Sequence, residues 1–262
     1  MYEIQTYLGA DGLMHCTVCK EPVEAFYPKG SLLEMRKHHR QCACERKAYA
    51  EEAQYYKEKE HRELIARNKK ICFEEKEMEG FTFQNVERDS GVIRIAEEYV
   101  TNWQKMKQNH MGYLFWGPVG TGKSYLAACI ANALLEKEVT VKMTNFNTIL
   151  NDLFAAEDKT EYIRLLNGYE LLIIDDLGVE RNSEYALENI FSVIDWRYRS
   201  GKPLIITTNL PLAQLKQETK IEKKRIYDRI LERCVPVKID GVSRREAMAN
   251  DNMQTMKSIL KI

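Results

Sequence analysis

The stretch Gly117-Pro118-Val119-Gly120-Thr121-Gly122-Lys123-Ser124 decides the fold of this 262-residue chain. It follows the apolar run Tyr113 to Trp116, which is typical of a buried strand, and precedes Tyr125 to Glu136, which has the composition of a helix. Glycines let consecutive main-chain N–H groups turn inward around phosphate oxygens, and the amino end of a helix adds the positive end of its dipole. The pattern G-x-x-x-x-G-K-S in this order therefore predicts a nucleotide-phosphate site.

The residues of this loop have separate expected roles. Lys123 is placed to reach the β and γ phosphates of ATP, and Ser124 offers its hydroxyl to Mg²⁺. The loop residues that we predict to contact the nucleotide are Gly117, Pro118, Val119, Gly120, Thr121, Gly122, Lys123, Ser124 and Tyr125.

Two further apolar runs end in polar side chains. Leu171 to Ile174 is followed by Asp175 and Asp176, which therefore emerge at the carboxyl end of a strand, where ligands bind in such sheets. We expect Asp175 to hold Mg²⁺ and Asp176 to polarise the attacking water as general base. Asn209 follows another such run and is expected to face the γ-phosphate, although an asparagine before Leu-Pro is also ordinary turn chemistry.

Segments of helical period alternate with short β-type runs from Phe81 onward, which indicates an α/β fold with a parallel sheet covered by helices. The five expected strands are Tyr113 to Trp116, Val139 to Thr144, Leu171 to Asp175, Leu204 to Thr208 and Val235 to Ile239.

The composition divides the chain into three parts. Residues 1–44 are rich in turn formers, residues 45–80 form a charged and almost breaker-free linker, and residues 81–262 contain the α/β domain. The run Glu45 to Glu79 predicts a long exposed helix that Gly80 ends, and a solvated helix without a further role is the alternative.

Four cysteines cluster in the first part, as Cys16-x-x-Cys19 and Cys42-x-Cys44. Four thiolates suit tetrahedral Zn²⁺, which would stabilise a segment too small and irregular to fold alone. The second pair has one intervening residue where two is usual, and a nearby histidine is an alternative ligand; the candidates are His15, His38 and His39. The remaining cysteines, Cys72, Cys129 and Cys234, are expected in the core.

Composition and charge exclude several classes of protein. Hydrophobic residues make up 44% and charged residues 30%, and no apolar run has the length of a membrane span. The amino terminus lacks the pattern of a signal peptide, so a cytoplasmic protein is expected. Lys plus Arg and Asp plus Glu both number 39, so the net charge is zero, and any contact with nucleic acid must use a local patch or patches aligned by assembly.

Two segments are candidates for such a patch. Residues 145–167 combine Phe146, Phe154 and Tyr162 with Lys159 and Arg164, a combination suited to stacking single-stranded bases, with core packing as the alternative. Residues 216–233 carry seven basic side chains against four acidic ones and could contact DNA or a neighbouring subunit, with a solvated helix face as the alternative.

The ordered set GPVGTGKS, LLIIDD and ITTN, followed by Lys224 to Ile230 and Gly241 to Arg245, resembles the AAA+ ATPases of the DnaC/DnaI helicase-loader group and their relative, the transposition helper IstB. The resemblance covers Phe81 to about Met248. It implies a P-loop sheet in the order 5-1-4-3-2, with ATP bound between subunits.

The resemblance also implies roles for individual residues. Asn209 would be sensor 1, and Arg229 would be the arginine finger offered to a neighbour's γ-phosphate. From the sequence alone, a surface ion pair of Arg229 with Asp228 or Glu232 is the alternative. Arg245, or else Arg244, would be sensor 2 at the nucleotide.

The sequence departs from the general AAA+ pattern in two places. Asp176 stands where most of the superfamily has glutamate, so we expect slow hydrolysis of ATP to ADP and phosphate, stimulated by assembly, DNA or a partner. After the last expected strand only about 23 residues remain, which predicts one helix and thus a reduced carboxyl-terminal lid.

The resemblance implies an ATP-dependent loader of a replicative hexameric DNA helicase. Its zinc-bearing amino-terminal module would bind the helicase, and its AAA+ domain would bind ATP, Mg²⁺ and single-stranded DNA in an ATP-dependent oligomer. One alternative is an IstB-like helper ATPase that assembles on DNA and directs a transposase. Another is a scaffold that binds ATP without useful turnover, because of Asp176.

Overall fold

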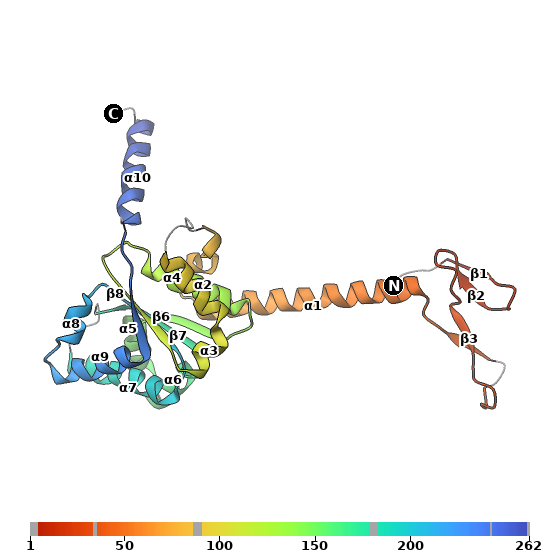
Figure 1. Ribbon diagram of the computed structural model, residues 1–262, viewed down its shortest axis with the longest axis horizontal. Coiled ribbons are helices and arrows are strands. Elements are labelled where there is room, and N and C mark those ends of the chain that lie inside the picture. The colour runs from red at the N-terminus through yellow and green to blue at the C-terminus, as the bar shows by residue number, and fades with distance from the viewer. Residues whose placement is uncertain (1–4, 34–35, 86–90, 179–182, 242, 261–262) are drawn as a thin grey trace. The chain divides into compact units, whose positions relative to one another are not determined.

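The computed structural model describes residues 5–33, 36–85, 91–178, 183–241 and 243–260 (Figure 1). The side chains of residues 85, 244–248, 250 and 251 are outside the described part. By its internal contacts the chain divides into two compact units, Met1–Leu64 and Ile65–Ile262. Among the described residues, no helix has both the length and the apolar character needed to cross a bilayer.

The first unit contains two short antiparallel hairpins, which the sequence analysis did not predict. Their strands are β1 (Thr6–Leu8) paired with β2 (Met14–Cys16), and β3 (Glu24–Phe26) paired with β4 (Lys37–His39). Its cluster of buried residues consists of Cys16, Val23 and Cys42. So small an apolar core needs a further stabilising element, because domains of this size bury too little surface to fold on apolar contacts alone.

Helix α1 (Ala43–Cys72) is exposed along almost its whole length, as expected, but it ends earlier than the predicted Glu79. The reason is that Cys72 and Phe73 turn into the core of the second unit, where both are buried. Two short 3₁₀ helices, η1 (Lys76–Gly80) and η2 (Phe83–Asn85), follow. The end of the segment predicted as a linker is therefore part of the second unit, which begins at Ile65.

The second unit is built on a five-stranded parallel sheet in the order β6-β7-β8-β5-β9. Numbered along the chain and read from β9, this is 5-1-4-3-2, the order that the resemblance implies. Each strand lies within two residues of its predicted range; the strands are β5 (Gly112–Trp116), β6 (Val141–Asn145), β7 (Leu171–Leu177), β8 (Leu204–Thr208) and β9 (Cys234–Lys238).

Helices cover both faces of the sheet (Figure 1). They are α2 (Gly91–Thr101), α3 (Trp103–Gln108), α4 (Lys123–Leu135), α5 (Phe146–Ala155), α6 (Lys159–Leu166), α7 (Glu184–Ser200), α8 (Leu212–Lys216) and α9 (Ile221–Arg233). Neighbouring strand residues alternate between two cores: Phe115 packs with α2 and α4, whereas Leu114 packs with α5, α7 and α9. In the described chain after β9 there is a single helix, α10 (Arg244–Leu260).

Candidate functional site

The glycines of the phosphate-binding loop adopt backbone conformations that other residues avoid. Gly117, Gly120 and Gly122 have φ angles of 147°, 82° and 92°. A Cβ atom on Gly117 would lie 2.2 Å from the carbonyl oxygen of Ile239, and one on Gly120 would lie 2.2 Å from Oγ of Ser243. Because the loop has no room for side chains at these two positions, its backbone can approach a phosphate closely.

Lys123 begins helix α4 directly after the loop and is buried beneath it. Its Nζ donates hydrogen bonds to the carbonyl oxygens of Gly117 (3.0 Å) and Pro118 (2.7 Å). Oγ1 of Thr121 donates to the same Pro118 oxygen at 2.9 Å. The ammonium group is thus held inside the curve of the loop, where the phosphates of a nucleotide would bind.

Tyr125 has a supporting role in this structure. Its ring stacks on Phe81 with centroids 4.4 Å apart, and its hydroxyl donates to the carbonyl oxygen of Thr82 at 3.2 Å. These contacts attach the segment after η1 to the first turn of α4. Val119, at the tip of the loop, is exposed.

Asp175 lies near the carboxyl end of the inner strand β7, beside Ser124 and Thr207. Oγ1 of Thr207 donates to Oδ1 of Asp175 at 2.5 Å, and the Ser124 hydroxyl also hydrogen-bonds to this carboxylate. Burial raises the pKa of Asp175, and these two hydrogen bonds partly offset the effect. The two predicted ligands of Mg²⁺, Ser124 and Asp175, are therefore in contact, and a hydroxyl beside a partly desolvated carboxylate suits that ion.

Asp176 occupies an irregularity in strand β7, where the pairing with β8 shifts between Ile174 and Leu177. Its φ angle is 58°, in the left-handed region, and its main-chain N–H donates to Oγ1 of Thr207 at 3.0 Å. Asp and Asn are the side chains that tolerate this region best apart from glycine. This backbone gives a physical reason for aspartate, not glutamate, at this position.

Asn209 is brought next to Asp176, as the sequence predicts. Nδ2 of Asn209 donates to Oδ1 of Asp176 at 3.3 Å. The turn after β8 is instead formed by Thr208, whose Oγ1 donates to the carbonyl oxygen of Leu177 (2.7 Å) and accepts from the N–H of Leu210 (3.1 Å). The turn chemistry considered for Asn209 thus belongs to its neighbour, and the Asn209 amide faces the acids.

Arg229 lies on α9, and its described partners are on α7. Its Nη2 is 2.5 Å from Oδ1 of Asp195, an ion pair without hydrogen-bond geometry, and its guanidinium lies 4.5 Å from the centroid of the Phe191 ring. The surface pair with Asp228 or Glu232 considered from the sequence is not what the structure shows. The side chains of Arg244 and Arg245 lie outside the described residues, so their sensor role stays a prediction.

Three arginines of α9 form a row against aromatic rings of α7. Arg225 stacks 4.2 Å from the Phe191 centroid, and Arg233 stacks 4.5 Å from the Tyr198 centroid. Arg225, Arg229 and Arg233 are four residues apart, so they lie on one face of the helix. Their guanidinium groups are fixed by stacking, which suits recognition of a phosphate or carboxylate on another molecule.

The aromatic residues proposed for single-stranded DNA have different environments. Phe146 is buried in the core, so the packing alternative holds for it. Tyr162 is half-buried and donates to Oδ2 of Asp152 at 2.9 Å. Phe154 is 82% exposed at the end of α5, and Lys159 lies 4.6 Å from the Tyr185 ring. Phe154 and Lys159 remain candidates for a contact with nucleic acid, whereas Phe146 does not.

The four cysteines of the first unit meet at one point. The sulfur atoms of Cys16, Cys19, Cys42 and Cys44 all lie within 4.8 Å of one another. Zn–S bonds of about 2.3 Å in a tetrahedron place sulfurs about 3.8 Å apart, so this arrangement fits a zinc ion. The spacing of one residue in the second pair is compatible with the cluster, because Cys44 lies in the first turn of α1.

Main-chain N–H groups point at the sulfur atoms of the first cysteine pair. The N–H of Val18 donates to Sγ of Cys16 at 3.4 Å, and a hydrogen bond from the main chain of Glu21 lowers the pKa of Cys19 to about 6. Lys20, with φ of 63°, makes the turn that directs these amides. Amides that point at sulfur are a feature expected of metal ligands. Burial acts in the opposite direction on the second pair, where it raises the pKa of Cys42 and raises that of Cys44 to about 11.

The nearby histidines contact other groups. His15 pairs with Asp11 at 3.0 Å, and His39 pairs with Glu45 at 3.2 Å. Nδ1 of His38 is 2.9 Å from the carbonyl oxygen of His39. Among the described residues the four sulfurs are therefore the ligand set that the structure supports.

Sequence reasoning missed Arg197, which is buried without a carboxylate partner among the described residues. Its guanidinium donates to the carbonyl oxygens of Tyr169 (2.8 Å), Glu170 (2.8 Å) and Pro203 (2.6 Å), and burial lowers its pKa to about 9. These carbonyls precede β7 and β8, the strands that carry the acids and Asn209 at their other ends. A lone arginine in the amphipathic pattern of α7 gives no sequence signal for this role.

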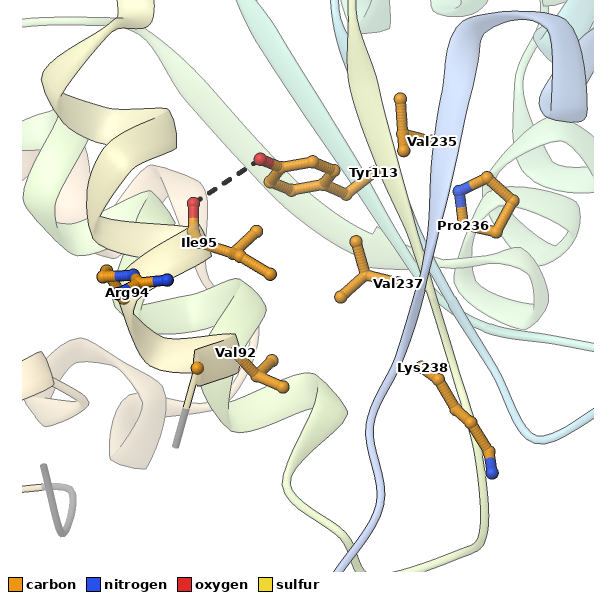
Figure 2. Close-up of a pocket in the computed structure, with 9 residues that line it drawn as sticks. Val92, Arg94, Ile95, Tyr113, Val235, Pro236, Val237 and Lys238 are labelled. Carbon is orange, nitrogen blue, oxygen red and sulfur yellow. Dashed lines mark hydrogen bonds between the residues drawn. The ribbon is translucent and has the colours of Figure 1, made fainter. Parts of the chain in front are cut away.

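A groove of 640 Å³ lies between helix α2 and the edge strand β9 (Figure 2). Its walls are mainly apolar and include Val92, Ile95 and Val237, with the Tyr113 hydroxyl donating to the carbonyl oxygen of Ile95 at 3.5 Å. None of the phosphate-loop residues and neither of the two acids lines this groove. This groove is thus separate from the chemistry of the loop.

Comparison with known proteins places this geometry in a family. The sequence model of the family described as IstB-like ATP binding protein matches residues 48–251. The crystal structure of DnaI is similar to this chain, with a TM-score of 0.58 and 25% identity over 68% of this chain and 99% of that one.

Two curated relatives are replicative helicase loaders. DnaC of Escherichia coli (strain K12) is 29% identical over 149 residues, which are 55% of this chain and 58% of DnaC. DnaI of Bacillus subtilis (strain 168) is 24% identical over 192 residues, which are 67% of this chain and 62% of DnaI. The chain therefore spans about three fifths of the length of these relatives.

Proposed function

Because the chain belongs to the family of IstB-like ATP-binding proteins and has the AAA+ fold of the DnaC/DnaI group, we propose that it is an ATP-dependent loader of a replicative hexameric DNA helicase. In this proposal the cysteine module of residues 1–44 binds zinc and the helicase. Residues 45–80 connect it to the ATPase domain of residues 81–262, which binds ATP and single-stranded DNA.

The observation that carries the loader proposal is the four-cysteine cluster placed before the ATPase fold. Residues 48–251 match the family, so the cluster, which ends at Cys44, lies wholly outside the shared region. A small metal-clamped unit ahead of a nucleotide switch suits a protein that grips a partner and then releases it.

In this proposal each residue of the site has a separate role in ATP hydrolysis. Lys123 would contact the β and γ phosphates, and Asp176 would accept a proton from the attacking water, with Asn209 holding the water and the γ-phosphate in line. Mg²⁺, held by Ser124 and Asp175, would neutralise charge that develops on the phosphate oxygens.

Hydrolysis would depend on assembly because one residue comes from a neighbouring copy. Arg229, supplied in trans, can accelerate phosphoryl transfer by about 10³ to 10⁵. Within one chain Arg229 pairs with Asp195. When copies assemble, this ion pair would have to break so that Arg229 can contact the neighbour's phosphate. Arg245, or else Arg244, would complete the site as sensor 2.

Co-purification with a hexameric replicative helicase tests the loader proposal. The full chain, zinc-loaded, is expected to retain the helicase, and Cys42→Ser is expected to lose it while still binding ATP. A chain that binds zinc and ATP but retains no replicative helicase would contradict the proposal.

The second candidate is a transposition helper that assembles on duplex DNA and directs a transposase, favoured by the description of the matching family. The same co-purification with a transposase in place of the helicase distinguishes the two. Retention of the transposase alone would select the helper function.

A further inference from the structure

Glu74 follows the end of helix α1 by two residues and hydrogen-bonds to strand β6 and helix α5, near the strand ends where the acids lie. Oε1 accepts a hydrogen bond from Oγ1 of Thr144 at 2.6 Å, and Oε2 accepts one from Oγ1 of Thr148 at 2.9 Å. Thr144 is in strand β6 and Thr148 is in the first turn of α5. One carboxylate therefore holds the two elements that meet at Asn145.

Asn145 links this contact to the nucleotide site. Its Oδ1 accepts from the N–H of Thr148 at 2.9 Å, and in the parallel register it is the partner of Asp175. Glu74, Asn145 and Asp175 line one small polar cavity of 40 Å³. A displacement of Glu74 would thus move Asn145, which is the neighbour of Asp175, the predicted Mg²⁺ ligand, on the adjacent strand.

The end of α1 is fixed firmly enough to transmit such a displacement. Phe73, next to Glu74, is buried in the core. Nζ of Lys142 donates to the carbonyl oxygen of Ile71 at 3.1 Å, and Lys69 pairs with Glu136 at 3.2 Å. These contacts hold the last turn of α1 against β6 and α4, so a movement of the helix must be taken up by the groups that it contacts.

Helix α1 also carries a ligand of the cysteine cluster. It is one continuous helix from Ala43 to Cys72 and includes Cys44 near its beginning. The helix ends directly before Phe73 and Glu74.

We propose that Glu74 is a positioning residue that couples the C-terminal turn of α1 to the acids of the nucleotide site. It acts through Thr144 and Thr148 and does not touch the nucleotide. The inference rests on the proposed ATPase function and adds a route by which the bound nucleotide and the end of α1 influence each other. Such coupling is reciprocal. If a change at the end of α1 alters the free energy of nucleotide binding, nucleotide binding must alter the conformational equilibrium of that turn by the same free energy.

Hydrogen exchange of the full-length protein tests this reciprocity. The wild type is compared with Glu74→Gln, with and without ADP–beryllium fluoride and Mg²⁺, and amide exchange is followed over residues 65–74. Glu75→Gln is the matched control, because Glu75 lines the same cavity, but among the described residues its carboxylate makes no hydrogen bond, and only its main-chain carbonyl accepts one, from Met78. Nucleotide affinity is measured in parallel.

In the wild type and in Glu75→Gln, the nucleotide is expected to change the exchange rates of the last turn of α1 by about fivefold or more, the lower range of measured couplings. In Glu74→Gln this difference should be lost while the nucleotide still binds. If Glu74 only anchored the segment, Glu74→Gln would raise the exchange rates equally with and without nucleotide and leave their ratio unchanged. That result in Glu74→Gln would overturn the proposal.

Two further outcomes are informative. If Glu74→Gln does not fold, Thr148→Val removes the α5 half of the contact and must reduce the same ratio, or the proposal fails. If the wild type binds nucleotide without any change in residues 65–74, the coupling is absent, whatever the helicase experiment shows. Absence of nucleotide binding would instead contradict the proposed ATPase function.

Discussion

Asp176→Asn tests whether this carboxylate activates the attacking water. The substitution preserves the local structure, because Asn tolerates the left-handed backbone at φ of 58° as Asp does. The amide oxygen of the new side chain can still accept from Nδ2 of Asn209, which lies 3.3 Å from Oδ1 in the native protein. The change therefore removes the base and little else.

The expected loss follows from the contribution of a positioned general base, about 10²- to 10⁴-fold in rate. At about 1.36 kcal/mol for each factor of ten, this is about 2.7 to 5.4 kcal/mol of transition-state stabilisation. Nucleotide affinity should be nearly unchanged, because Asp176 acts on the water and not on the phosphates.

Asp176→Glu is the informative companion. It restores the acid that most of the superfamily has, but glutamate lacks the tolerance of aspartate for a left-handed backbone, which costs about 1 kcal/mol or more. We expect lower stability in urea unfolding and a turnover above that of the Asn variant.

The assay is phosphate release at saturating Mg·ATP with single-stranded DNA and partner present, together with the affinity for a fluorescent ADP. An Asn variant that binds nucleotide and releases phosphate at the wild-type rate would refute the assignment of Asp176 as base. A wild-type protein that binds ATP and releases none under these conditions would be a nucleotide-gated scaffold.

Four other outcomes follow from the structure. Lys123→Ala should raise the Kd for ATP at least about tenfold in an equilibrium titration, since hydrogen bonds to charged groups contribute about 1.5–3 kcal/mol. Arg229→Ala should spare nucleotide binding but remove about 10³-fold of assembly-stimulated turnover; Arg199→Ala, which frees the same carboxylate on α7, is the control, and equal turnover in both variants would count against the trans role. Cys42→Ser should abolish bound zinc in elemental analysis and make residues 1–44 sensitive to protease, while zinc retained at the native level would exclude the cluster as its site. Burial raises the pKa of Asp175, so the folded state binds this proton more tightly and the group's contribution to stability falls as the pH rises through its folded pKa. In Mg²⁺-free buffer the stability of Asp175→Asn relative to wild type should therefore increase from pH 4 to pH 7, and a difference independent of pH would contradict this.

The sheet and the phosphate loop could be predicted because their signals are local. Four-residue apolar runs such as Leu171 to Ile174 have strand length and end in polar residues, and the glycines of the loop have φ angles that few other residues adopt. Asn209 could be placed near the acids for the same reason, since parallel strands end at one edge.

The remaining features depend on contacts between distant segments. Helical composition continues to Glu79, but burial of Cys72 and Phe73 ends α1 earlier. The partner of Arg229 comes from α7, more than 30 residues away, and no periodicity reveals it. The short hairpins of the first unit carry too little apolar pattern to be recognised, because the four sulfurs and not a hydrophobic face organise that unit.

Among the residues that the structure describes, strand β9 pairs with β5 alone, which leaves its other side as an open border of the sheet. Pro236 stands in the middle of this strand, and proline is tolerated where its missing N–H would face away from the sheet. Lys238 adds a charge at the same border, which further discourages an incoming strand. Backbone pairing between two copies through β9 is thus disfavoured, and the proposed ATP-dependent assembly would separate without breaking any backbone pairing at this strand.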